Sequence, residues 1–176
     1  MTREIFELIQ RSQKGEKEAF GRLYSLFLKK VYRFIYFMIY DEAMAEDLTQ
    51  DTFFKVWKSL PSFSPARGSF NSYLLTIARN NVIDYQRKKK EIYLNPIMED
   101  EIPSSEVIED NVIKTEEQQE ARSILAKLEG ADRRLIILRF FEELSMAEIA
   151  KMENLKEGAV RVKIYRILRK MKNLAD

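Results

Sequence analysis

Apolar side chains recur every three or four residues along most of the chain, which is the spacing of one face of an α-helix. The pattern predicts a short helix over residues 2–13 and a second, aromatic-rich helix that continues to about Tyr40. Asp41 is then placed to cap a third helix. The chain has five glycines and four prolines, and this scarcity favours long helices over a turn-rich β architecture. The pattern therefore predicts an all-α fold.

Residues 42–60 form a predicted helix with one apolar and one polar side. At about 100° per residue, one side collects Ala45, Leu48, Thr49, Thr52, Phe53, Val56 and Leu60. The opposite side carries Glu46, Asp47, Gln50, Asp51 and Lys58, with Phe54 in its middle. An aromatic ring exposed among carboxylates and an amide is a candidate protein-binding hot spot. Packing of Phe54 against a neighbouring helix is the alternative, and this helix alone does not decide between the two.

A further helix is predicted from about Ser69 to Lys90, after the loop from Ser62 to Gly68, in which Phe63 is the large apolar residue. Its inner face contains Phe70, Leu74, Ile77, Ala78, Asn81 and Tyr85, and its outer face contains Arg79, Asn80, Ile83, Arg87 and Lys90. Four consecutive cations end this helix, where they complement the negative end of the helix dipole. One or two cations suffice for that purpose, so a polar face reaching back to Arg79 favours a binding surface.

The charge balance changes sharply after this helix. Residues 91–120 contain ten acidic side chains against Lys114, with prolines and serines that interrupt a helix. We interpret residues 93–114 as a flexible acidic linker. The predicted order is therefore a helical domain over residues 1–92, the linker, and a smaller helical domain over residues 115–176.

The last thirty residues predict two short helices joined by a tight turn. Ser145 is a plausible N-cap with Glu148 three positions on, and Asn154 lies where a helix ends in a left-handed residue. The second helix begins near Glu157, and its predicted buried stripe consists of Val160, Ile164, Leu168 and Met171. Its other faces carry Arg161, Lys163, Arg166, Arg169, Lys170 and Lys172, and no acidic residue occurs from Gly158 to Ala175.

This layout is that of a helix-turn-helix, whose second helix enters the major groove of DNA. The alternative is an ordinary amphipathic helix that is basic by chance. The absence of acidic residues favours DNA binding, because a face that serves solubility alone usually mixes charges of both signs.

Composition narrows the possible chemistry. The formal net charge of +2 conceals the segregation described above. The chain has no cysteine and no histidine, which excludes Cys or His nucleophiles, His-dependent triads and the usual zinc sites. No carboxylate spacing resembles a metal site, so we expect no catalytic residue, no metal and no cofactor.

The charged N-terminus is not a signal peptide, and the apolar stretch 27–40 is too short to span a bilayer, so we expect a cytoplasmic protein.

With these pieces assembled, the sequence resembles the extracytoplasmic-function (ECF) group of bacterial sigma factors, the smallest branch of the sigma-70 family. AEDLTQDTFFKVW, at residues 45–57, resembles the family's polymerase-binding helix in region 2. FNSYLLTIARNNVIDYQRKKK, at residues 70–90, resembles its promoter-melting and −10 recognition helix. SMAEIAKMENLKEGAVRVKIYR, at residues 145–166, resembles its region 4 helix-turn-helix for the −35 element. The resemblance covers nearly the whole chain and implies a region 2 bundle and a region 4 helix-turn-helix.

The resemblance implies a role for each set of residues. The residues that would face the clamp of the largest polymerase subunit are Glu46, Asp47, Gln50, Asp51 and Phe54. Those that would contact −10 DNA are Phe63, Arg79, Asn80, Ile83, Arg87 and Lys88, with Phe63 and Asn80 as walls of a pocket for a flipped base. Those that would contact the −35 element are Lys156, Arg161, Val162, Lys163, Tyr165 and Arg166. Asp84 matches a family position, and we expect it to bond a neighbouring arginine.

The resemblance also implies partners, namely core RNA polymerase through its clamp and flap, promoter DNA, and an anti-sigma factor, often membrane-anchored. No small-molecule substrate is expected. The chain departs from the family pattern at the turn before the second helix, which reads Asn154, Leu155, Lys156. It departs again at Val162, where a small polar residue is frequent, so the −35 sequence need not be the common one.

Three rival functions remain open at this point. A helix-turn-helix regulator acting without polymerase would need a dimer interface, and the sequence shows no coiled-coil heptads. An enzyme would have to rely on carboxylate or lysine chemistry, since His, Cys and a Gly-rich phosphate loop are absent. A helical adaptor would not need two basic faces.

Overall fold

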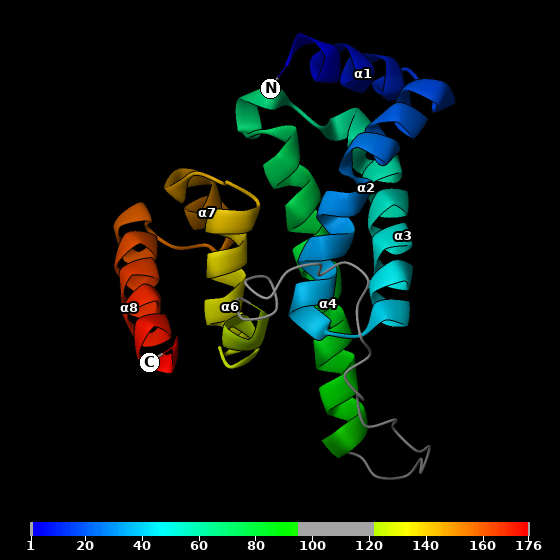
Figure 1. The fold of residues 1–176 in the computed structure, drawn as a ribbon. Helices are drawn as coiled ribbons and strands as arrows, with labels where there is room; N and C mark the ends of the chain where they lie inside the picture. The colour runs from blue at the N-terminus through cyan, green and yellow to red at the C-terminus, as the bar shows by residue number, and fades with distance from the viewer. Residues whose placement is uncertain (1, 95–121, 176) are drawn as a thin grey trace. The chain divides into compact units, whose positions relative to one another are not determined.

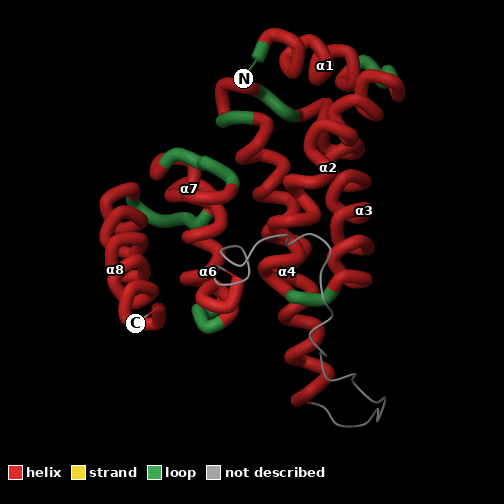
Figure 2. The backbone as a smooth tube through the Cα atoms, viewed as in Figure 1, coloured by secondary structure: helices red, strands yellow, loops and turns green. Residues whose placement is uncertain are grey.

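Figure 1 shows the computed structural model, which describes residues 2–94 and 122–175. All regular secondary structure within these residues is helical (Figure 2), which confirms the predicted all-α class. The chain divides into two compact units, residues 1–98 and 99–176. Most of the predicted acidic linker, residues 95–114, lies outside the described residues.

The first unit is built from four α-helices and two short 3-10 turns. In chain order these are α1 (Arg3–Gln13), α2 (Lys17–Ile39), α3 (Glu42–Ser59), η1 (Leu60–Ser62), η2 (Pro65–Arg67) and α4 (Phe70–Leu94). α2, α3 and α4 pack against one another, and α1 packs against α2 and η1 (Figure 1). Fully buried side chains such as Val31, Phe34 and Leu74 fill the space between the long helices. The apolar stretch 27–40 is thus part of α2 and its capping residue, and most of residues 31–38 are buried in the bundle.

The ends of α2 and α3 are set by residues at or next to each helix terminus. Tyr40 ends α2 in the left-handed conformation, with φ 53°. Asp41 then caps α3 by accepting a hydrogen bond from the backbone N–H of Met44 at 3.0 Å, as predicted. Pro61 follows in η1 and has no N–H to continue the α-helix.

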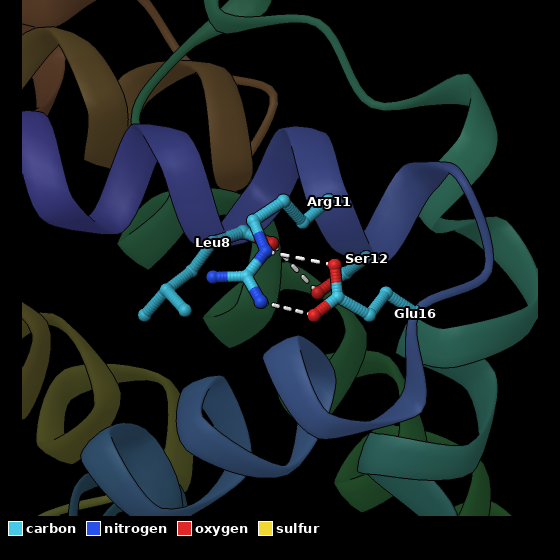
Figure 3. Close-up of polar contacts among 4 residues, drawn as sticks. All are labelled: Leu8, Arg11, Ser12 and Glu16. Atoms are coloured by element: carbon cyan, nitrogen blue, oxygen red, sulfur yellow. Dashed lines mark hydrogen bonds and ion pairs between the residues drawn. The ribbon is translucent and has the colours of Figure 1, made fainter.

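A second tight corner joins α1 to α2 (Figure 3). Arg11 donates two hydrogen bonds to the carboxylate of Glu16, and the Ser12 hydroxyl donates to the carbonyl of Leu8 at 2.7 Å. Hydrogen bonding to the Arg11 guanidinium lowers the pKa of Glu16. Gly15 turns the chain at φ 88°, a conformation that a side chain would strain. The corner between α1 and α2 thus combines a glycine turn with an exposed ion pair across it.

The second unit contains helical residues 122–126, then α6 (Gly130–Ile136), the π-helical turn η3 (Ile137–Phe141), α7 (Met146–Met152) and α8 (Glu157–Ala175). Ser145 and Glu148 form the predicted capping box at the start of α7. Asn154 is left-handed at φ 53°, as predicted, and the N–H of Leu155 closes the turn on the carbonyl of Ala150 at 2.8 Å.

The predicted buried stripe of α8 is wrong at one position. Leu168 is 41% exposed, whereas Ile167 is 3% exposed and packs inward with Val160 and Ile164. Both residues lie one helical turn from Ile164, at three and four positions, so helical periodicity does not decide between them. The neighbouring helix decides, because α6 packs against α8 on the side of Ile167.

A buried ion pair holds α6 against the end of α7. Arg134 donates from Nε and Nη2 to the two carboxylate oxygens of Glu153, at 2.9 and 2.8 Å. The two side chains are 13% and 8% exposed. A bidentate pair fixes direction as well as distance, so this contact helps to set the turn from which α8 departs.

Candidate functional site

The structure gives α3 the two sides that the sequence predicted. Phe54 is 57% exposed, and the Lys58 ammonium lies over its ring, 4.1 Å from the centroid. Its neighbour Phe53 is 4% exposed and packs against Tyr24, with ring centroids 4.6 Å apart. The carboxylate and amide side chains around Phe54, which are Glu46, Asp47, Gln50 and Asp51, are all exposed. The alternative that Phe54 is buried by a neighbouring helix is thereby excluded.

An apolar hollow adjoins Phe54, between α2 and α3. It has a volume of about 340 Å³ and is lined by Lys17, Phe20, Tyr24, Phe53, Phe54 and Trp57. The rings of Phe20 and Trp57 lie 4.8 Å apart and form part of its floor. Phe20 and Tyr24 of α2 line this hollow, which the sequence pattern of that helix did not indicate. The exposed Phe54 therefore belongs to a wider aromatic surface.

Phe63, the predicted wall of a base pocket, is largely buried at the start of the loop before α4. Its side chain is 8% exposed, and its ring packs against those of Phe70 and Tyr73, at 5.5 and 4.9 Å between centroids. The aromatic ring thus anchors the loop to the core. A role for Phe63 as a wall of a base pocket stays a prediction.

The loop after Phe63 exposes a short polar stretch. Arg67 is exposed, and Gly68 follows at φ 146° with a hypothetical Cβ only 3.1 Å from the Ser72 hydroxyl oxygen. Gly68 thus lets the loop turn closely over the start of α4. Gln13 of α1 also reaches this segment: its amide nitrogen donates to the carbonyls of Leu60 and Phe63, at 3.0 and 2.8 Å. Sequence reasoning missed Gln13, because its partners lie almost fifty residues away.

The outer face of α4 carries the remaining predicted −10 residues. Asn80, Arg87 and Lys88 are exposed, and Arg79 and Ile83 are half-buried. Arg79 donates to the amide oxygen of Asn80 at 3.1 Å, which orients that amide on the surface. Arg87 pairs with Asp84 at 3.2 Å, so the predicted bond between Asp84 and a neighbouring arginine is present.

Beneath this face, a polar chain links α4 to α3. The ammonium of Lys55 donates to the side-chain oxygen of Asn81, and the amide nitrogen of Asn81 donates to the Thr52 hydroxyl at 2.9 Å. Thr52 in turn donates to the carbonyl of Leu48 at 2.7 Å. The buried Asn81 amide is thus bonded through both its oxygen and its nitrogen, and it fixes the register of the two helices that carry the candidate surfaces.

The solvent face of α8 has the composition of a nucleic-acid-binding surface. The predicted contact residues are all exposed, namely Lys156, Arg161, Val162, Lys163, Tyr165 and Arg166. Tyr165 is 69% exposed, and Arg161 pairs with Glu157 at 2.9 Å. A hollow of about 240 Å³ beside α6 is lined by Asp132, Lys163, Arg166, Ile167 and Lys170. Cations on several sides of one exposed helix suit a polyanionic partner.

The described residues lack two other kinds of feature, a metal-binding cluster and a membrane-spanning helix. Among the residues that the structure describes, no group of three or more acidic side chains could hold a metal ion. Over the described ranges, 2–94 and 122–175, no helix has the length and apolar character needed to cross a membrane.

Comparison with known proteins agrees with this geometry. The Sigma-70 region 2 family matches residues 23–92, and the Sigma-70 region 4 family matches residues 118–171. The ECF RNA polymerase sigma factor SigW of Bacillus subtilis is 31% identical over 172 residues, covering 92% of this chain and 91% of SigW. The ECF RNA polymerase sigma factor BldN of Streptomyces coelicolor is 33% identical over 174 residues, covering 97% of this chain, which spans 65% of the length of BldN.

Solved structures show the same fold. CnrH, in complex with the cytosolic domain of CnrY, aligns with a TM-score of 0.70 at 24% identity, covering 95% of this chain and 94% of CnrH. The sigma factor RpoE of Bartonella quintana, in complex with the anti-sigma factor NepR, aligns with a TM-score of 0.73 at 24% identity, covering 88% of this chain and 95% of RpoE. With both family regions in order and a relative matched along nearly its whole length, the chain belongs to the sigma-70 family, in its group of ECF RNA polymerase sigma factors.

Proposed function

We propose that this chain binds core RNA polymerase and directs it to specific promoters, where it reads the −35 and −10 elements and stabilises the melted strand. The observation that carries the proposal is α8, an exposed cationic helix that follows a capped helix and a tight left-handed turn. This is the geometry with which a helix-turn-helix enters the major groove. The role requires no covalent chemistry from the chain itself, and it is exercised in the cytoplasm.

Polymerase docking is assigned to the polar side of α3. Phe54 is a large exposed ring surrounded by Glu46, Asp47, Gln50 and Asp51. An aromatic anchor within a polar rim is the usual composition of a binding hot spot. We assign this surface to the clamp of the largest polymerase subunit and the second unit to the flap.

The −10 element is assigned to the outer face of α4 and the loop before it. The Asn80 amide can read a base edge, and Arg87 and Lys88 can contact phosphates. Half-buried Arg79 and Ile83 flank Asn80 on the same face. Binding an unstacked base better than a stacked one shifts the promoter towards its open state, which is how melting follows from recognition.

The −35 element is assigned to α8. Arg161, Lys163 and Arg166 provide cations for phosphates and for guanine edges, and Lys156 and Tyr165 extend the same surface. Val162 is half exposed and can contact a thymine methyl group, but it cannot donate a hydrogen bond. We therefore expect a −35 sequence in which a thymine faces Val162.

Polymerase is needed because each reader is weak alone. A good base contact contributes about 1–3 kcal/mol, and each unit offers few of them. Once both units are docked on one enzyme, binding of the second element becomes intramolecular and its effective concentration is high. The acidic linker assigned to residues 93–114 does not compete for DNA. An anti-sigma factor that covers the surface around Phe54 would keep the chain inactive. The structurally similar RpoE is known in complex with an anti-sigma factor, NepR.

DNA binding with and without core polymerase tests the proposal. We expect the full chain to bind core polymerase in a pull-down and to shift promoter DNA specifically only when core is present. Arg166→Ala should weaken the specific shift, whereas Arg3→Ala, which removes an exposed cation on α1, should not. Specific shifts of equal strength without core would instead identify a regulator that acts without polymerase.

A further inference from the structure

Gln13 makes a contact that neither family region accounts for. It is the last residue of α1, outside the region 2 match, which begins at residue 23. Its side-chain amide nitrogen donates to the carbonyl oxygens of Leu60 at 3.0 Å and Phe63 at 2.8 Å. An amide nitrogen has two hydrogens to donate, so both are used on backbone separated from Gln13 by 47 and 50 residues.

The two accepting carbonyls mark the start of the loop that precedes α4. Leu60 is the first residue of η1 and is fully buried, and Phe63 is the residue at which η1 ends. The N–H of Phe63 also bonds the carbonyl of Leu60 at 3.0 Å, which closes the turn from within. Gln13 therefore holds the turn from outside, at the point where the chain leaves the core and enters the loop 64–67, of which residues 65–67 are exposed.

The same turn is anchored on its other side by the Phe63 ring. That ring packs against Phe70 and Tyr73 of α4, at 5.5 and 4.9 Å between centroids. Packing of the ring fixes the side chain of Phe63 but does not bond the carbonyl oxygens of the turn. The two hydrogen bonds from Gln13 add that constraint, because they fix two carbonyl directions three residues apart.

Gln13 is the last residue of α1, next to the corner that joins α1 to α2. In that corner Arg11 bonds Glu16 and Ser12 bonds the carbonyl of Leu8 (Figure 3). Its side chain is half-buried, so its hydrogen bonds are partly shielded from water. The corner thus presents the amide to the turn at low entropic cost.

We propose that Gln13 is a positioning residue for −10 recognition, which sets the path of the loop 64–67 over the start of α4 without touching DNA. The inference rests on the proposed function, because it requires that this loop and α4 meet the −10 element. It gives α1 a role in promoter reading, although α1 lies far in the sequence from residues 62–90, which would meet the −10 element. A recognition loop whose path is fixed before binding loses less entropy on binding, and it discriminates better between bases.

The test uses the full chain in the holoenzyme. Gln13→Glu and Gln13→Met keep the length of the side chain but remove both donors, and Gln10→Ala, an exposed residue of the same helix, is the matched control. The readouts are the affinity for a single-stranded −10 oligonucleotide, the loss of affinity when each of its bases is changed, and the affinity for core polymerase. We expect discrimination between bases to fall roughly tenfold in both Gln13 variants, since shifts of about 1 Å in a positioned group suffice for such losses. Core affinity should not change.

Two results would overturn the inference. One is unchanged discrimination in both variants. The other is a parallel fall in core affinity, which would make Gln13 a general structural residue. Asn80→Ala in the same assay separates this inference from the proposed function. If Asn80→Ala changes discrimination and the Gln13 variants do not, the inference alone fails; if Asn80→Ala has no effect, the −10 assignment fails and the inference with it.

Discussion

Two adjacent phenylalanines on α3 allow the docking assignment to be separated from folding. Phe54 is 57% exposed, so its truncation removes little buried area. We expect Phe54→Ala to change the free energy of unfolding by no more than about 1 kcal/mol, because alanine also has the higher helix propensity. Phe53 is 4% exposed and packs on Tyr24, so Phe53→Ala should cost roughly 3–5 kcal/mol.

For binding to core polymerase we expect the reverse order of the two variants. Among folded molecules, Phe54→Ala should lose more affinity than Phe53→Ala. An aromatic hot spot typically contributes about 2 kcal/mol or more, which corresponds to a Kd for core polymerase roughly thirtyfold higher in Phe54→Ala. The assay is equilibrium binding of labelled chain to core polymerase, together with thermal unfolding of each variant. Lys58→Ala is a second variant that tests the same surface, since the Lys58 ammonium lies over the Phe54 ring.

Two outcomes would refute this reasoning. If Phe54→Ala lowers the free energy of unfolding as much as Phe53→Ala does, the Phe54 ring is part of the core. Its exposure then does not explain an effect on polymerase binding. If Phe54→Ala is as stable as the parent chain and binds core polymerase equally well, the docking surface lies elsewhere on the molecule.

Three further predictions concern the second unit. Arg166→Ala should lower transcription from −35-dependent promoters about tenfold at unchanged core affinity, because one guanine or phosphate contact is lost; promoters with altered −35 sequences are the comparison. Arg134→Ala should cost roughly 3–5 kcal/mol in unfolding experiments, since it leaves the buried Glu153 carboxylate without its arginine, and a loss under 1 kcal/mol would contradict this. Asn154→Ala should cost about 1 kcal/mol and Asn154→Gly should not, because the backbone at φ 53° disfavours a Cβ.

Local signals in the sequence predicted the elements well. The helical spacing of apolar residues, the capping box of Ser145 and Glu148, and the left-handed Asn154 depend on near neighbours in the chain, so they can be read without knowing the fold. The position of Phe54 opposite the apolar stripe was also predicted, but its exposure was decided only by the structure, because a neighbouring helix could have covered the ring.

Features decided by distant contacts were not predictable in this way. Ile167 rather than Leu168 is buried because α6 packs on that side of α8, although both fit the helical period. The packing of Phe70 and Tyr73 of α4 against the ring of Phe63 could not be predicted from the loop sequence. The bonds of Gln13 to a turn 47 residues away leave no trace in the local pattern. In each case the tertiary partner, absent from the local sequence, sets the outcome.

Transcription from a genomic DNA library by core polymerase, with and without the purified chain, tests the central claim most directly. Our account predicts start sites that appear only with the chain and that share a −35 and a −10 element at one fixed separation, and it predicts that Arg166→Ala loses them. Start sites that do not depend on the chain, or that share no paired elements, would contradict it.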